Sequence, residues 1–414
     1  MKKILILLSL SSFLWATTIK QSVESSLKHT HRLKIENINL KIKKRYVQKA
    51  KSNNRPTLNL NLYKLKEKTE FIGKKDAIYD STNYSLSLNQ NLYNGGYDTN
   101  NIKMSKIDVE IEKIEYKRVT QTLIYKAINT HLELLLSKRL LALQKRLLNQ
   151  YNSILEIIKK KSKYGDESAL IDIQSRIYNQ KLKYQQLKED YNYKVGKYIS
   201  IIGRKPKNLK SYIKIQKRYI KNPSKLNLTL SNQNIIKNIL EIEKSEYKIK
   251  RERAKFLPKV DLQLQAYKSE PLAQLGVITQ NQYSVKLNLN YNLYNGNRDR
   301  LDREISRLER LKLIEQKEEL KREVYLKYLY FYESYKYSIK NKKILYRYIK
   351  NENIKYNKDK KIFKLSEKKS LLDIVSSLDK LYIAKSLLLE NINSNIKNYI
   401  SLIFLQSKLT LDNI

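Results

Sequence analysis

The sequence predicts a mainly helical protein with four short β-strands, built as two copies of one structural repeat. The chain of 414 residues has only 8 glycines and 5 prolines, which leaves few turns and favours long helices. A stretch that contains Asn-Leu-Tyr-Asn-Gly occurs twice, at 84–96 and 285–297. Apolar and polar residues alternate in both copies, as in a strand, and about 65 residues of helical pattern follow each copy.

Landmarks in the two halves lie at nearly constant separation, which indicates internal duplication. Pro56 corresponds to Pro258, and Asn91 to Asn292, at separations of 202 and 201 residues. The predicted organisation is a signal peptide at 1–16, a first repeat at 17–203, an irregular connector at 204–230 and a second repeat at 231–414.

The N-terminus has the pattern of a secretory signal, because Lys2 and Lys3 precede an apolar run from Ile4 to Leu14. This run is too short to span a bilayer, and no later segment approaches the roughly 20 apolar residues of a membrane helix. The absence of cysteine excludes disulfides, thiol nucleophiles and a lipidated N-terminal cysteine. We therefore expect an exported chain without a transmembrane helix.

The net charge of +44 raises the question of nucleic-acid binding, but the basic residues are spread along the chain and interleaved with glutamate. This distribution is typical of solvated helix faces. His29 and His31 are two residues apart, so on a helix they would not form a metal pair. His131 matches no nucleophile pattern, and there is no phosphate-binding loop. We expect no catalytic residues, no cofactor and no metal.

Each predicted repeat has a helix, two strands and two long helices. Pro56 ends the first helical pattern, and the strand with Leu58, Leu60 and Leu62 follows. The remaining first-repeat segments are a polar loop at 67–81, the second strand, a helix at 97–163, a tip at 164–168 and a helix at 169–202. The second repeat is expected to have helices at 233–256, 298–363 and 370–405, with strands near Val260 and Val285.

The four strands are the length of strands that cross an outer membrane. Four strands from one chain cannot close a barrel, and open edges are forbidden in lipid, so several chains would have to contribute. A soluble sandwich of the two hairpins is the alternative. Predicted outward residues are Leu58, Leu60, Leu62, Leu86, Leu88, Val260, Leu262, Leu264, Leu287 and Leu289. Predicted inward residues are Asn59, Asn61, Ser87, Gln263, Asn288 and Asn290.

Over its mature length the chain resembles the TolC-like outer membrane efflux protein family. The resemblance is carried by the duplicated plan, the proline before each first strand, the two Asn-Leu-Tyr-Asn-Gly motifs and the runs at 165–168 and 370–374. It implies a homotrimer in the cell outer membrane, with a 12-stranded β-barrel in lipid and coiled-coil helical hairpins that form a periplasmic tunnel. It also implies an outer membrane channel for efflux or type I secretion, served by a periplasmic adaptor and an inner-membrane pump of the RND or ABC type.

The resemblance also suggests where the functional residues lie. The family's gate often carries two acidic residues three positions apart after the second tip; here Asp373 matches the first, and Ser376 occupies the second. The hairpin tips that would meet the adaptor or pump are Gly165, Asp166, Glu167, Ser168, Glu367, Lys368, Lys369 and Ser370. The strand-to-helix turns are Asn94, Gly95, Asn295 and Gly296. The alternative function is an exported coiled-coil structural or nucleic-acid-binding protein without a pore; a periplasmic adaptor would need one hairpin and many short strands.

Overall fold

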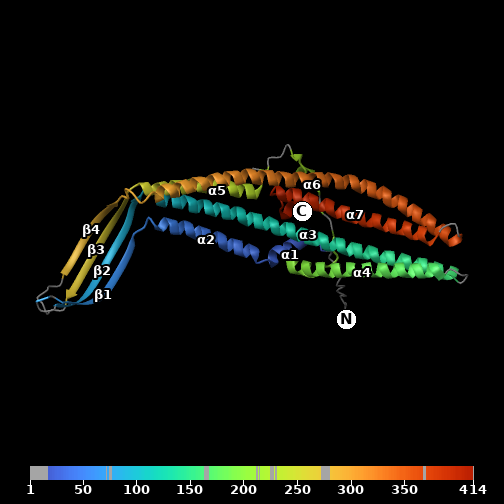
Figure 1. Cartoon of the computed structure of the whole chain (residues 1–414), viewed down its shortest axis with the longest axis horizontal. Helices are drawn as coiled ribbons and strands as arrows, with labels where there is room; N and C mark the ends of the chain where they lie inside the picture. The colour runs from blue at the N-terminus through green and yellow to red at the C-terminus, as the bar shows by residue number, and fades with distance from the viewer. Residues whose placement is uncertain are drawn as a thin grey trace, which may run out of the picture. The chain divides into compact units, whose positions relative to one another are not determined.

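The computed structural model describes residues 17–413, except 71, 74–76, 163–166, 211–212, 214, 224–227, 229–230, 272–279 and 367–369. The predicted signal peptide lies outside the described residues. Figure 1 shows the elements. They are α1 (Ile19–His29), α2 (Arg32–Ser52), β1 (Thr57–Thr69), β2 (Ala77–Asn94), α3 (Tyr97–Ser162), α4 (Glu167–Ile202), η1 (Lys217–Tyr219), α5 (Gln233–Arg253), η4 (Ala254–Phe256), β3 (Lys259–Pro271), β4 (Gln280–Asn290), α6 (Arg298–Leu365), α7 (Leu371–Leu405) and η5 (Leu411–Asn413).

The elements follow the predicted order, and the helices end within a few residues of their predicted bounds. The continuous helix expected at 18–52 is wrong, because Thr30 has extended backbone angles (φ −74°, ψ 133°) and separates α1 from α2. Contacts with α4 hold α1 in place: the hydroxyls of Ser25 and Ser26 donate to the carbonyl oxygens of Ile202 (2.9 Å) and Ile201 (2.8 Å). The break has no local glycine or proline signal, so tertiary contacts determine it.

The strands form one antiparallel sheet in the order β1-β2-β3-β4. The polar loop expected at 67–81 is wrong in extent, because β1 continues to Thr69 and β2 begins at Ala77. Backbone pairing needs no apolar alternation, so Lys66 pairs with Asp80 although both side chains are charged. The strand expected to run from Val285 to the Asn-Gly turn is displaced, since β4 begins at Gln280 and ends at Asn290.

The chain divides into two compact units. Unit 1 consists of Met1–Lys34, Lys117–Gln233 and Lys321–Ile414; unit 2 consists of Ile35–Tyr116 and Asn234–Leu320. Unit 2 therefore contains the sheet and the helical segments that lead into and out of it. Each unit draws on both predicted repeats, and α3 and α6 pass from one unit into the other.

The core of unit 1 is formed by residues that recur every three or four positions along its helices. On α3, Leu147, Tyr151, Ile154 and Ile158 are at most 6% exposed, as the apolar face of an amphipathic helix requires. They pack in one cluster with Ile173 and Ile177 of α4, Tyr356 and Phe363 of α6, and Ile374, Val375, Leu378 and Leu381 of α7. Across the described part of the chain, no helix has a stretch long and apolar enough to cross a membrane.

Candidate functional site

The sheet has one apolar and one polar face, and the strand register defines both. Residues directly opposite one another in antiparallel strands point to the same face. Leu58 lies opposite Leu88, which lies opposite Leu264, which lies opposite Val285. The next row joins Asn59, Ser87, Gln265 and Ser284 on the other face. The register places all ten predicted outward residues on the first face and all six predicted inward residues on the second.

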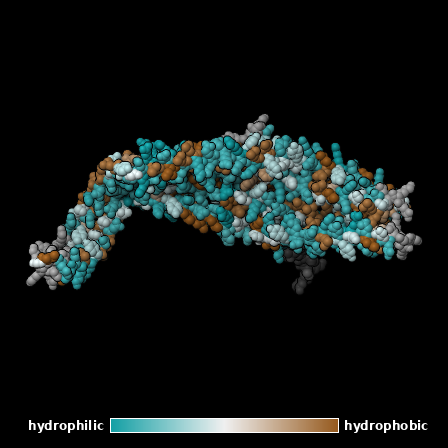
Figure 2. Space-filling model, viewed as in Figure 1, coloured by the Kyte–Doolittle hydropathy of each residue, from teal (hydrophilic) through white to brown (hydrophobic). Residues whose placement is uncertain are grey.

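The apolar face is exposed in the single chain. Leu60 and Leu287 are 68% and 67% exposed, although side chains of this type are normally buried. Figure 2 shows hydrophobic side chains along the side of the sheet where β4 lies. Alternation alone would place Leu92 on the same face as Leu86 and Leu88, but Leu92 lies at a bulge between Asn91 and Tyr93 that interrupts the alternation.

The first strand-to-helix turn joins β2 to α3. Its conformation depends on a glycine with positive φ and on a buried aspartate. Gly95 has φ +66°, and a Cβ atom there would lie 2.5 Å from the carbonyl oxygen of Ala254. Two residues into α3, the buried Asp98 carboxylate accepts hydrogen bonds from the side-chain amides of Asn53 (3.1 Å), Asn91 (2.7 Å) and Asn94. These contacts hold the start of α3 against the residue that follows α2 and the last residues of β2.

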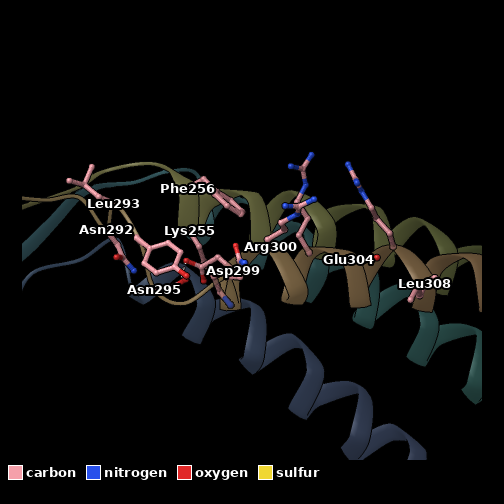
Figure 3. A pocket seen from close by; sticks show the side chains of 13 residues that line it. Lys255, Phe256, Asn292, Leu293, Asn295, Asp299, Arg300, Glu304 and Leu308 are labelled. Carbon is pink, nitrogen blue, oxygen red and sulfur yellow. Dashed lines mark hydrogen bonds between the residues drawn. The ribbon is translucent and has the colours of Figure 1, made fainter.

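The second turn has the same sequence but fewer contacts. Asn295 donates to the Asp299 carboxylate at 2.6 Å, as Asn94 does to Asp98. Gly296 has φ +70°, yet a Cβ atom there would meet nothing within 4 Å. A cavity of about 720 Å³ lies beside this turn, against the start of α6 (Figure 3). The two predicted turns therefore share a backbone conformation and differ in packing.

At the second hairpin tip, Asp373 caps the start of α7. Its carboxylate accepts from the Ser370 backbone N–H (3.1 Å) and hydroxyl (3.0 Å), while the Ser370 hydroxyl accepts from the Asp373 N–H (3.2 Å). Both Asp373 and Ser376 are exposed. Glu167 begins α4 and Ser168 follows it, whereas Gly165, Asp166, Glu367, Lys368 and Lys369 lie outside the described residues.

The sequence analysis missed an acidic residue on the packed side of α7. The Tyr151 hydroxyl donates to the Asp379 carboxylate at 2.8 Å, and joins α3 to α7. Burial raises the pKa of Asp379, against the lowering effect of Tyr151, Lys183 and Arg176. Asp379 lies four residues after the buried Val375, and a charged residue in phase with an apolar stripe is the signal that could have revealed it.

His131 is fully buried in unit 1 and forms a chain of hydrogen bonds. Its Nε2 donates to the Lys210 carbonyl oxygen (3.0 Å), which leaves Nδ1 to accept from the Ser22 hydroxyl (2.8 Å). The Ser22 oxygen in turn accepts from the Tyr198 hydroxyl (2.9 Å). Ser22 and His131 resemble a nucleophile and its base. Both residues are 0% exposed, however, so their contact is structural. Among the described side chains, no group of three His, Asp or Glu could hold a metal.

Comparison with known proteins supports the resemblance to the TolC-like family. Residues 23–194 match the family described as outer membrane efflux protein. A solved structure of CusC, described as forming a transmembrane channel, superposes with a TM-score of 0.84 at 13% identity over 94% of this chain and 91% of CusC. The resemblance to the TolC-like family is therefore confirmed. The TolC-like fold also occurs in two further structures, which share little sequence with this chain.

The first is the CmeC outer membrane channel of Campylobacter jejuni, which has a TM-score of 0.81 at 14% identity and covers 94% of this chain and 85% of CmeC. The second is the outer membrane protein VceC of Vibrio cholerae, with a TM-score of 0.82 at 12% identity, covering 94% of this chain and 96% of VceC. A search of the curated proteins gives no significant match. At 12–14% identity, the similarity to these structures shows that the chain shares their fold.

Proposed function

We propose that this chain is one protomer of an outer membrane channel through which efflux substrates or secreted proteins pass passively to the exterior. The observation that carries the proposal is the sheet, which has one exposed apolar face and one polar face. Lipid accepts the first face and rejects the second, because an unpaired amide in hydrocarbon costs several kcal/mol. The polar face would therefore line water.

The open edges of the sheet support assembly from several copies. β1 and β4 end the strand order, so their outer backbone groups need partners in a membrane. A homotrimer in which β4 of one copy pairs with β1 of the next would close a 12-stranded barrel. Hydrogen bonding would then be complete around the ring, and no edge would meet lipid.

The helical part supports a role as a periplasmic tunnel that works with other proteins. The α3–α4 and α6–α7 hairpins pack in one core, and their tips would contact a periplasmic adaptor and an RND- or ABC-type inner-membrane pump. The matched proteins are described as outer membrane channels or proteins rather than enzymes. Energy for export would come from the pump, and we assign no catalytic residue or cofactor to this chain.

Asp373 and Ser376 remain the proposed gate residues. In a trimer three copies of Asp373 could approach the axis, where like charges favour a bound cation. Its capping contact with Ser370 orients the carboxylate at the start of α7. Replacement of the family's second acid by Ser376 predicts a weaker cation site than a paired acidic ring.

Disulfide crosslinking between sheet edges tests the assembly, since the native chain has no cysteine. Asn59→Cys on β1 is combined in turn with Ser284→Cys, Asn288→Cys or Asn290→Cys on β4. At least one pair should give covalent dimers and trimers after oxidation of outer-membrane fractions. A ladder from none of these pairs, with a soluble monomer in fractionation, would refute the channel and favour the exported coiled-coil alternative.

A control pair checks that oxidation works. Ser87 and Gln265 lie directly opposite each other in β2 and β3 of the same sheet. The double variant Ser87→Cys/Gln265→Cys should therefore form a disulfide within one chain. Its band should move as a monomer on a denaturing gel, which separates pairing inside the sheet from pairing between copies.

A further inference from the structure

The cavity beside the second strand-to-helix turn is the most distinctive unassigned feature of unit 2. It lies between η4, the 291–297 segment and the first three turns of α6, and has a volume of about 720 Å³. Figure 3 shows Lys255 and Phe256 on one side, Asn292 and Leu293 on the segment before α6, and Arg300 on α6. The wall combines basic, apolar and polar side chains with two acidic ones, Asp299, which accepts a hydrogen bond from Asn295, and Glu304.

The basic side chains form a row on one face of α6. Arg300, Arg303 and Arg307 are spaced three and four residues apart, so they share that face. Within the described chain, none of the three forms an ion pair, and the buried Nε of Arg303 has no hydrogen-bond partner. Lys255 is already neutralised, because its Nζ lies 2.7 Å from both Glu252 and Asp302. Glu304 lies four residues after Arg300 and three before Arg307 and also lines the cavity, so this face of α6 carries three positive charges and one negative charge.

The apolar part of the cavity continues the apolar face of the sheet. Leu293 and Tyr294 are 84% and 76% exposed, and Leu308 closes the wall beyond the arginines. Leu287 and Leu289 lead along β4 towards this segment. A free inorganic anion would satisfy the arginines and leave these side chains in water. A ligand with both an anionic group and a hydrocarbon chain would cover both parts.

A second copy of the chain does not supply the negative charge needed to balance the arginines. In the proposed trimer the helix that leads into the neighbouring edge strand is α2. Glu36 is its only acidic residue, against eight lysines and arginines. An α2 placed beside the arginine row would add positive charge, so the neighbouring copy increases the need for an anion.

We propose that this cavity binds the phosphate-bearing head group of an anionic phospholipid, with an acyl chain along Leu293 and the apolar face of β4. The inference rests on the proposed function, in which this face meets lipid. Guanidinium groups bind phosphate oxygens through paired hydrogen bonds, and several basic residues act together on an anionic head group. The site would anchor the junction between sheet and helices at the membrane surface.

The test is lipid titration of the purified, delipidated full-length protein, read by native mass spectrometry. Phosphatidylglycerol, phosphatidylcholine and inorganic phosphate are the three probes. The wild type should bind phosphatidylglycerol at least about tenfold more tightly than phosphatidylcholine. The variant Arg300→Gln/Arg303→Gln/Arg307→Gln should lose that preference. The matched control Lys340→Gln/Lys342→Gln/Lys343→Gln, which removes three exposed charges from the same helix, should keep it.

Each other outcome overturns the proposal. Equal binding of inorganic phosphate and phosphatidylglycerol would mean a free-anion site, and equal lipid preference in both variants would exclude the arginine row. If the arginine variant fails to assemble in phosphatidylcholine while the lysine variant assembles, the arginines mediate contact between copies instead. Oligomer formation by the wild type in the outer membrane is scored separately, so failure of the channel proposal is distinguished from failure of the lipid site.

Discussion

Acidification should destabilise unit 1 through His131. Burial lowers the pKa of this imidazole from 6.5 to about 4, and the nearby Arg204 also lowers the pKa, while the Lys210 carbonyl oxygen acts in the opposite direction. The unfolded chain therefore binds one more proton than the folded chain between these two pH values. Stability contributed by neutral His131 is present above pH 6.5 and is lost as the pH falls towards 4.

The size of the effect follows from the two pKa values. A difference between 6.5 and about 4 corresponds to about 3 kcal/mol at full protonation. Most of it is reached before the folded state itself titrates, so lowering the pH from 7 to 5 should reduce the free energy of unfolding by about 2 kcal/mol. The Ser22 and Tyr198 hydroxyls and the Lys210 carbonyl surround the ring, and no carboxylate hydrogen-bonds to it in the described structure.

Urea unfolding of the detergent-solubilised protein, followed by far-UV circular dichroism at pH 7 and pH 5, measures this loss. His131→Gln should remove most of the pH dependence, because an amide can still donate to Lys210 and accept from Ser22 without titrating. His31→Gln, at an exposed position, should leave the dependence intact. If the wild type and His131→Gln lose equal stability between the two pH values, burial of a neutral histidine is not the cause.

Three further predictions concern the sheet, the turns and the tip. Leu287→Lys should impair membrane assembly, because a lysine on the lipid face near the bilayer midplane destabilises a barrel by about 2–4 kcal/mol. Asn290→Lys, on the polar face, should be tolerated. Equal loss of trimer from both variants on gels would contradict the two-faced sheet. Gly95→Ala should lower the thermal midpoint more than Gly296→Ala, since both glycines have positive φ but only the first Cβ would meet a backbone oxygen; matching midpoints would show that this close approach relaxes freely. Asp373→Asn keeps an acceptor for the α7 cap and removes the charge, so block of conductance by divalent cations in planar bilayers should weaken; unchanged block would place the gate elsewhere.

The periodicity of apolar residues and the positions of prolines were enough to predict most of the helices and strands. Strict alternation identified both faces of the sheet, because a strand places successive side chains on opposite sides. The three- and four-residue spacing of a predicted stripe on α3 placed its members on one helix face, of which the last four are buried and the first two half-buried: Leu140, Leu143, Leu147, Tyr151, Ile154 and Ile158. Pro56 and Pro258 marked the ends of helices because proline lacks the N–H that a helix interior requires.

The features that the sequence could not predict depend on contacts between distant segments. The break at Thr30 follows from the packing of α1 on α4, where no local signal exists. The extension of β1 and β2 beyond their apolar residues follows from backbone pairing between polar segments. The partner of Asp379 is Tyr151, which is 228 residues away in the chain, and no spacing rule connects them.

The candidate site divides in the same way. The glycine turns were predictable, since Asn-Gly occurs after each second strand and glycine readily adopts the positive φ that both turns have. The arginine row was not singled out, because its residues looked like an ordinary solvated helix face. Which basic side chains form ion pairs depends on the fold: Lys255 binds Glu252 and Asp302, whereas none of the three arginines forms an ion pair within the described residues.

The unequal packing of the two strand-to-helix turns has an evolutionary consequence. If the repeats descend from one ancestral unit, Asn53 and Lys255 are equivalent positions. Asn53 binds Asp98 at the start of α3, whereas Lys255 forms an ion pair with Asp302, one turn into α6. Selection for a rigid junction could then be met by one copy, and the other was released to accept substitutions. Duplication would in this way leave the second strand-to-helix turn free to evolve a new binding specificity without loss of the fold.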